Sequence, residues 1–294
     1  MRIAVLTSLF LFACAAPAVE GPASRAASQA ASVANKASSM AASAPAEMGL
    51  TGILGEEAFK ALHVLRTDLP PRARGKDMKL SDGSAAYLSL PAGDGPHPGV
   101  IVIHEWWGLN DNIRHWADRL AADGYAALAV DLYAGRVATV PNDAMTFMKS
   151  VKADEAKATL MAAYKMLTTD DRIKAPKVGS IGWCFGGGWS LQAALNMPAL
   201  DAAVIYYGRL VTDAKALGAI NAKALGIFGN LDKGIPPASV DAFEAAMKTA
   251  GRDLKVLRFD ANHAFANPSS GRYDQPSAEK AFAAVRTFFS ANLK

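Results

Sequence analysis

The chain has 294 residues, 51% of them hydrophobic, and a formal net charge of +4. This length and apolar content are enough to bury one large core, although length alone would also allow two domains. The basic residues are scattered and are not interleaved with aromatic residues, which argues against a nucleic-acid-binding protein. The two cysteines are far apart and no histidines or cysteines have metal-ligand spacing, so we expect no metal. No Gly-x-Gly-x-x-Gly follows a predicted strand, so we expect no dinucleotide site.

The N-terminus predicts export. A positively charged start is followed by an apolar run over residues 3–12, which is too short to span a membrane and is typical of a secretory signal. We therefore assign residues 1–18 to a signal peptide. The segment LFAC at residues 11–14 resembles a bacterial lipobox, in which Cys14 is lipidated and becomes the new N-terminus. Plain cleavage after a later alanine is the alternative. Either outcome predicts a bacterial protein that is periplasmic or is a lipoprotein attached to the membrane through Cys14.

Two segments separate the signal peptide from the rest of the chain. Residues 19–50 are mostly alanine and serine, a composition with few large side chains to bury, so we predict a flexible linker. Residues 51–75 carry apolar side chains at helical spacing, which fits an amphipathic segment to which the sequence assigns no role. Residues 76–294 form the predicted catalytic domain, for the reasons that follow.

A regular alternation of strand-like and helix-like segments begins at residue 76. A hairpin is predicted over residues 78–90, with its turn at Asp82-Gly83. Short apolar runs typical of strands then begin at Val100, Ala126, Val178, Ala203, Leu225 and Lys255. Helical segments are predicted over residues 112–123, 142–168, 185–196, 237–250 and 277–293. This alternation predicts an α/β fold with a mainly parallel central sheet and helices on both faces.

The most informative segment runs from residue 178 to residue 188. A strand-like run breaks there into a turn of small residues, with Cys184 at its centre and Gly182 and Gly186 on either side. A nucleophile at such a strand-to-helix turn needs these glycines, because side chains there would collide with neighbouring strands. The helix that follows directs N–H groups and its positive dipole end at the sulfur, which favours a thiolate. We therefore predict a cysteine nucleophile, with a buried cysteine that only packs as the alternative.

A cysteine nucleophile needs a base and an orienting acid, which in this kind of fold follow it in the order acid, then histidine. Asp232 and His263 come in that order, each just after a predicted strand. The carboxyl ends of parallel strands share one edge of a sheet, so the three groups can meet there. An ordinary turn residue is the alternative for Asp232. His104 also ends a strand, but it precedes the nucleophile, so we assign it a packing role.

These residues, together with the segment HEWWGLN at residues 104–110, resemble the dienelactone hydrolase family. The resemblance covers residues 76–294. It includes three further blocks, which are DLYA at 131–134, AAVIYYG at 202–208 and HAFANP at 263–268. It implies an α/β-hydrolase fold and the hydrolysis of esters or lactones without a cofactor.

The resemblance also implies roles that spacing alone does not assign. By this resemblance, Glu105 is the carboxylate that contacts the resting thiol and moves away when substrate binds, which lets His263 pair with Cys184. The backbone N–H groups of Trp106 and Phe185 would form the oxyanion hole. A solvated carboxylate near a helix start is the alternative for Glu105.

The chain departs from the family members that cleave dienelactone, which hold the substrate carboxylate with two arginines. The first of these falls at Gly135, with Arg136 one residue later, and the second falls at Asn267. An amide cannot replace the planar, charged guanidinium, so we expect other esters or lactones as substrates. Arg136 remains a substrate-binding candidate, with a surface position as the alternative. Candidate pocket walls are the aromatic residues near strand ends, with packing in the core as the alternative: Trp107, Tyr133, Tyr207 and Phe265.

Together these features predict an exported, monomeric enzyme that hydrolyses small-molecule esters or lactones. The Cys184 thiolate attacks the carbonyl and forms a thioester, His263 exchanges the proton, and Asp232 orients the imidazole. Two alternatives stay open. One is a non-catalytic exported binding protein on a hydrolase scaffold, and the other is an acyltransferase, since other acceptors use the same acyl-enzyme.

Overall fold

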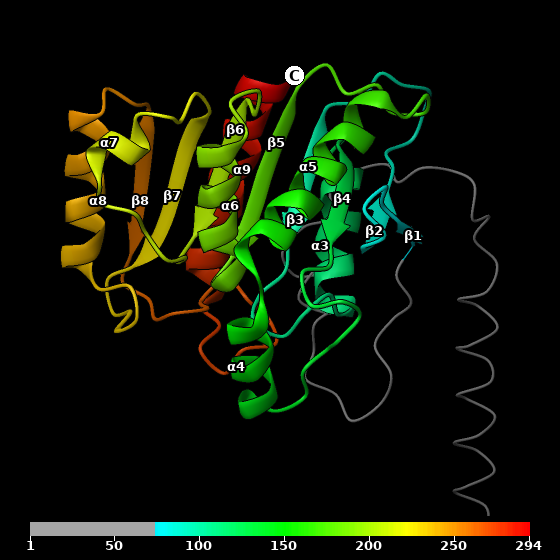
Figure 1. The fold of residues 1–294 in the computed structure, drawn as a ribbon. Coiled ribbons are helices and arrows are strands. Elements are labelled where there is room, and N and C mark those ends of the chain that lie inside the picture. Colours follow the sequence, from blue (N-terminus) through cyan, green and yellow to red (C-terminus); the bar gives the residue numbers. More distant parts are fainter. Residues whose placement is uncertain (1–73) are drawn as a thin grey trace, which may run out of the picture. The chain divides into compact units, whose positions relative to one another are not determined.

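The structure, a computed structural model, describes residues 74–294 (Figure 1). The predicted signal peptide (1–18), the linker (19–50), Cys14 and nearly all of the segment 51–75 lie outside the described residues. Within the part that is described, no helix is long and apolar enough to cross a bilayer.

One eight-stranded sheet runs through residues 74–294 (Figure 1). In chain order its strands are β1 (Lys76–Lys79), β2 (Ala85–Ser89), β3 (Gly99–Ile103), β4 (Ala126–Val130), β5 (Val178–Trp183), β6 (Ala202–Tyr206), β7 (Lys223–Gly229) and β8 (Leu254–Phe259). In space their order is β1-β2-β4-β3-β5-β6-β7-β8. The hairpin of β1 and β2 joins the sheet antiparallel to β4, whereas all the other neighbours pair in parallel. The predicted mainly parallel sheet is confirmed.

The helices of the described part are α3 (Asp111–Ala122), α4 (Pro141–Ser150), α5 (Ala153–Thr169), α6 (Phe185–Asn196), α7 (Ala214–Leu217), α8 (Pro237–Thr249) and α9 (Gln275–Leu293). The single helix predicted over residues 142–168 is wrong, because the structure has two helices there. Val151 and Lys152 between them have extended backbone, and Asp154 and Glu155 give α5 an acidic first turn of its own. The short helix α7 was not predicted.

The inner strands β3 to β6 are buried on both faces of the sheet. In β3, Ile101 and Ile103 belong to the core cluster that also contains side chains of α5, α6 and α8. Val100 and Val102 belong to the cluster with side chains of α3 and α9. Successive strand residues point to opposite faces, so each layer of helices receives every second residue. This double burial explains why the strands read as continuous apolar runs in the sequence.

The parallel strands carry the predicted site to one edge of the sheet. The chain reaches Glu105 just after β3, Cys184 directly after β5, Asp232 after β7 and His263 after β8. Since these four strands run in the same direction, their carboxyl ends lie along one edge. That edge is where open parallel sheets bind ligands.

Candidate active site

Cys184 occupies the tight turn between β5 and α6. Its backbone lies in the left-handed region, with φ 55° and ψ −115°, a conformation that is strained for a residue with a Cβ atom. Close backbone packing imposes this turn. A Cβ atom on Gly182 would lie 2.1 Å from the carbonyl oxygen of Gly186, and one on Gly186 would lie 2.2 Å from that of Ile103. Neither glycine can carry a side chain, and the turn has the geometry of a nucleophile elbow.

Asp232 and His263 are hydrogen-bonded to each other. Asp232 Oδ2 and His263 Nδ1 are 2.6 Å apart. The other oxygen of this carboxyl accepts the backbone N–H groups of Gly234 and Ile235, at 2.7 and 3.0 Å. Burial would raise the pKa of Asp232, but the hydrogen bonds to the carboxylate hold that pKa below its usual value. Asp232 is therefore a well-oriented anion.

His263 links Asp232 to Cys184. Burial opposes the imidazolium, but hydrogen bonds to Asp232 and to Cys184 outweigh this effect and raise the pKa of His263 to about 10. Because Asp232 takes Nδ1, Nε2 is the nitrogen left for the sulfur. A histidine that is protonated at neutral pH favours a thiolate beside it. We call these three side chains the Asp232–His263–Cys184 row.

Two backbone N–H groups next to this row can donate to an oxyanion. Phe185 is the first residue of α6, and the first N–H groups of a helix have no partner within it. The N–H of Trp106 donates to no backbone carbonyl within residues 74–294. The two segments are in close contact, because Gly186 packs against the carbonyls of Ile103 and His104. This arrangement suits an oxyanion hole made of backbone donors.

His104 lies outside the row and organises the neighbouring loops. It is fully buried, and both ring nitrogens are used: Nε2 accepts the N–H of Leu132 at 3.1 Å, and Nδ1 donates to the carbonyl of Glu105. Burial lowers the pKa of His104, which keeps the ring neutral. His104 thus ties the chain after β3 to the chain after β4, as a packing residue would.

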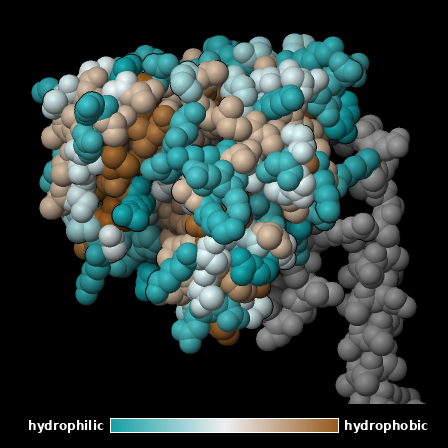
Figure 2. Space-filling model, viewed as in Figure 1, coloured by the Kyte–Doolittle hydropathy of each residue, from teal (hydrophilic) through white to brown (hydrophobic). Residues whose placement is uncertain are grey.

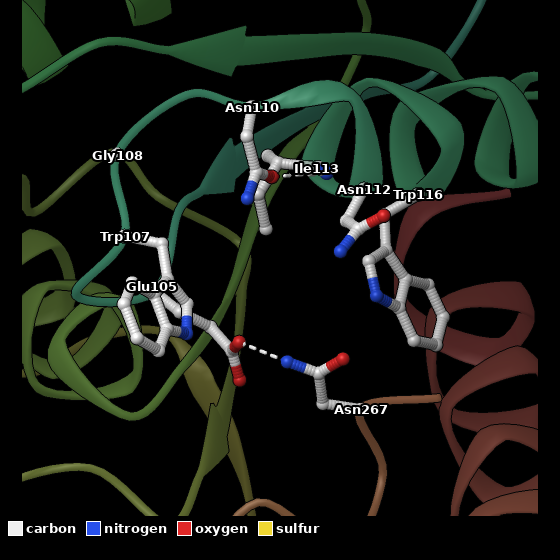
Figure 3. A pocket seen from close by; sticks show the side chains of 8 residues that line it. All are labelled: Glu105, Trp107, Gly108, Asn110, Asn112, Ile113, Trp116 and Asn267. Carbon is white, nitrogen blue, oxygen red and sulfur yellow. Dashed lines mark hydrogen bonds between the residues drawn. The ribbon is translucent and has the colours of Figure 1, made fainter. Parts of the chain in front are cut away.

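Glu105 is buried at the same edge of the sheet. Its Oε2 accepts a hydrogen bond from the side-chain amide of Asn267 (Figure 3). Burial raises the pKa of Glu105 to about 7, although the nearby His263 and the amide of Asn267 both lower it. The resemblance implies a contact between Glu105 and the resting thiol. In this structure the carboxyl is instead hydrogen-bonded to Asn267, and the interaction of Cys184 is with His263, whose pKa it raises.

Three of the four aromatic residues predicted as pocket walls pack in the protein interior. The Tyr207 ring lies 5.0 Å from the ring of His263 and 5.6 Å from that of Phe265. Tyr207, Phe265 and Tyr133 are all completely buried. Trp107 is half-buried and lines a small pocket (Figure 3). Trp107 is thus the member of this group that borders a hollow, whereas the other three pack in the interior.

The side chain of Arg136 packs against its own loop and against α4. Its Nε donates to the carbonyl of Tyr133 and its Nη2 to the hydroxyl of Ser150, both at 2.9 Å. Its guanidinium lies 4.4 Å from the ring centre of Phe147. Gly135 beside it has a φ of 83°, which disfavours any side chain there. The hydrogen bonds of Arg136 therefore go to this loop and helix.

Two residues at this site were missed by the sequence analysis. Ser269 donates its N–H and its hydroxyl to the side-chain oxygen of Asn267, and Asn112 donates to the hydroxyl of Ser269. The polar turn after Asn267 was a weak signal. The partner of Ser269 is 157 residues away, and no local pattern shows such a pairing. Within residues 74–294, no group of three or more His, Cys, Asp or Glu side chains could hold a metal ion.

The chain is similar to known proteins in both sequence and fold. The sequence profile of the dienelactone hydrolase family matches residues 84–293. The chain belongs to the dienelactone hydrolase family. It is therefore a hydrolase with the α/β-hydrolase fold, which confirms the predicted family and fold class.

Individual relatives support this assignment. A protein of Methylorubrum extorquens named carboxymethylenebutenolidase is 34% identical over 195 residues, which cover 61% of this chain and 67% of the relative. A protein of Saccharolobus solfataricus with the same name is 31% identical over 245 residues, covering 71% of this chain and 95% of the relative. The solved structure of a dienelactone hydrolase-like promiscuous phosphotriesterase from metagenomic libraries matches with a TM-score of 0.70 and 26% identity. That match covers 75% of this chain and 98% of the solved one.

We expect Asp232→Asn to lower the pKa of His263 and to slow the alkylation of Cys184 by iodoacetamide at neutral pH. The amide removes the negative charge that stabilises the imidazolium, so less of the protein carries the pair of imidazolium and thiolate. The alkylation rate should fall by about tenfold for each unit by which the pKa of His263 falls. The rate is measured across a pH range, with the modified cysteine located by peptide mass spectrometry. Asp260→Asn is the matched control, because Asp260 bonds Asn230 at the exposed surface. Identical pH profiles for the two variants would contradict the role of Asp232.

Proposed function

We propose that the protein hydrolyses carboxylic esters or lactones through a thioester acyl-enzyme on Cys184. The observation that carries the proposal is the Asp232–His263–Cys184 row, which ends at a sulfur held in a turn before the N-terminus of α6. Membership of the family makes hydrolysis the class of reaction. The row supplies a nucleophile, a proton carrier and an orienting anion for it.

In the first half-reaction, the Cys184 sulfur attacks the carbonyl carbon of the substrate. The carbonyl oxygen becomes an oxyanion, to which the N–H groups of Trp106 and Phe185 donate. His263 then gives its proton to the leaving alkoxide oxygen, the carbon–oxygen bond breaks, and a thioester remains on Cys184. In a lactone the leaving hydroxyl stays attached to the acyl chain.

The second half-reaction returns the enzyme to its starting state. His263, now neutral, takes a proton from a water molecule, whose oxygen attacks the thioester carbonyl. The carbon–sulfur bond breaks when the tetrahedral intermediate collapses, and the carboxylic acid leaves. Cys184 is again a thiolate beside a protonated His263. In both halves Asp232 stabilises the positive imidazole and fixes its orientation.

Cys184→Ser should lose most of the hydrolase activity, on the order of 10²-fold or more in kcat, because the base is matched to a thiol and not to a hydroxyl. The wild type, quenched during turnover of an aryl ester, should carry the acyl group on the peptide that contains Cys184. Stopped-flow release of the aryl alcohol and mass spectrometry measure the two effects. Undiminished turnover after complete alkylation of Cys184 would contradict a thioester mechanism.

We further propose that the acyl group of the preferred substrate carries no charge. In the family members that cleave dienelactone, two arginines hold the substrate carboxylate, and this chain has Gly135 and Asn267 at those positions. The neighbouring Arg136 is bonded to Tyr133 and Ser150. The amide of Asn267 is bonded to Glu105. A carboxylate would therefore enter the site without the charge-assisted hydrogen bonds that offset its desolvation.

A matched pair of aryl esters tests this substrate preference. The two esters share a leaving group and differ in whether the acyl chain ends in a methyl group or a carboxylate. A charge-assisted hydrogen bond contributes roughly 1.5–3 kcal/mol, so we expect kcat/KM for the neutral ester to be about tenfold higher or more. Dienelactone should also be a poorer substrate than the neutral ester. The reverse order would mean that another cation, such as the exposed Arg209, holds the carboxylate.

We also propose that the protein is exported and attached to the membrane by lipidation of Cys14. The support is the sequence at residues 1–18 and the alanine- and serine-rich linker after it. Expressed in a bacterium, the wild type should fractionate with membranes, and Cys14→Ala should be soluble in the periplasm or remain unprocessed. Cys184→Ala is the matched control for loss of a cysteine, and it should fractionate like the wild type. Soluble, equally processed wild type and Cys14→Ala would leave simple secretion in place of lipidation.

A further inference from the structure

A chain of hydrogen bonds between side chains ends on the buried carboxyl of Glu105. The amide of Asn112 donates to the hydroxyl of Ser269 at 2.9 Å, and that hydroxyl donates to the side-chain oxygen of Asn267 at 2.7 Å. The amide nitrogen of Asn267 then donates to Glu105 Oε2 (Figure 3). We call Asn112, Ser269 and Asn267 the Glu105 support chain. It joins the start of α3, the loop between β8 and α9, and the segment after β3.

Each residue of the support chain donates a hydrogen bond to the next one, in the direction of Glu105. Ser269 offers two donors, its N–H and its O–H, to the oxygen of Asn267. Asn112 donates to the Ser269 oxygen, which leaves the hydroxyl proton for Asn267. The oxygen of the Asn267 amide is thus fixed on the side of Ser269, and its NH₂ end must face Glu105. The support chain therefore always presents a donor to the carboxyl.

The second oxygen of the Glu105 carboxyl, Oε1, is buried at the same site. Glu105 is only 7% exposed, and its Oε1 has no hydrogen-bond partner among residues 74–294. Glu105 borders a small pocket, which Asn267 and Trp107 also line (Figure 3). Oε1 is therefore not hydrogen-bonded to the sulfur of Cys184. The sulfur interacts instead with His263 and raises the pKa of that histidine. The charge of His263 lowers the pKa of Glu105, so the carboxyl and the row interact electrostatically.

We propose that the Glu105 support chain holds Glu105 away from Cys184, so that the thiol is paired with His263 before any substrate binds. Asn112, Ser269 and Asn267 are then positioning residues that act on the sulfur through Glu105. The step that they permit is transfer of the thiol proton from Cys184 Sγ to His263 Nε2, which changes no other bond. The inference rests on the proposed function, because it describes the resting state of the same nucleophile.

The support chain matters because a free Glu105 carboxylate would oppose the thiolate. Two like charges that share a buried site cannot both persist without a cost. With the chain intact, one carboxyl oxygen is bonded to Asn267, and Nε2 of His263 is left for the sulfur. With the chain broken, the ionised carboxyl can turn to His263 and compete for its proton. The reactivity of the resting thiol therefore shows whether the support chain holds Glu105 in place.

The test measures the rate of iodoacetamide alkylation at Cys184 in the substrate-free full-length protein, one pH unit above the pKa of Glu105. Ser269→Ala and Asn267→Leu should each lower this rate, Asn267→Leu by about tenfold or more because a hydrogen bond to a charged group is lost. Ser270→Ala is the matched control, since the hydroxyl of Ser270 accepts the N–H of Arg272 and lies outside the support chain. It should alkylate like the wild type.

Rescue separates positioning from a general structural effect. Glu105→Gln removes the competing charge, so the double variants Ser269→Ala/Glu105→Gln and Asn267→Leu/Glu105→Gln should regain a rate near that of Glu105→Gln alone. A loss that Glu105→Gln does not rescue, or unchanged rates in both single variants, would overturn the inference. Hydrolysis of an aryl ester is assayed in parallel. An active enzyme that needs Cys184 but has an unreactive resting thiol would overturn this inference and leave the proposed function standing.

Discussion

The backbone contact between the first turn of α6 and the end of β3 is the constraint on which the rest of the site depends. Gly186 lies so close to the carbonyl oxygens of Ile103 and His104 that a Cβ atom would come within 2.2 and 2.5 Å of them. This contact fixes the nucleophile turn relative to the segment that carries Glu105 and the Trp106 N–H. Catalytic donors stabilise a developing charge only if their geometry is set in advance. Here backbone packing sets it, at positions where no side chain could be accommodated.

The surroundings of Asp232 and Glu105 shift the pKa values of the two carboxyl groups in opposite directions. Asp232 accepts hydrogen bonds from two backbone N–H groups and from His263, and its pKa is lowered despite burial. Glu105 is more deeply desolvated, accepts one hydrogen bond from a neutral amide, and its pKa is raised to about 7. Such a separation lets one carboxylate orient the imidazole at all working pH values while the other changes its charge near neutrality. The site therefore does not hold two permanently charged carboxylates.

Much of the fold and the row could be predicted because their signals are local. Strand runs, helix periods and the glycines around Cys184 each occupy a few neighbouring residues, and chain order then singled out Asp232 and His263. The break between α4 and α5 was not predicted, because the pattern is helical on both sides and only the backbone of Val151 and Lys152 departs from it. The link between Asn112 and Ser269 spans 157 residues. Side-chain pairings of that kind follow from the folded path of the chain and leave no periodic trace.

Asn267 is the residue that the proposal on substrate charge and the proposal on the resting thiol share. An arginine at this position would offer a permanent positive charge, both to a carboxylate on the substrate and to Glu105. The asparagine offers a positive charge to neither group. It gives Glu105 only a neutral hydrogen-bond donor, which Ser269 holds in place. Asn267 therefore supplies no positive charge to a substrate carboxylate, and the positive charge that lowers the pKa of Glu105 comes from His263. The same residue that removes a charge clamp for substrate thus also allows the carboxyl beside the row to lose its charge near neutral pH. Both effects follow from the absence of one guanidinium group.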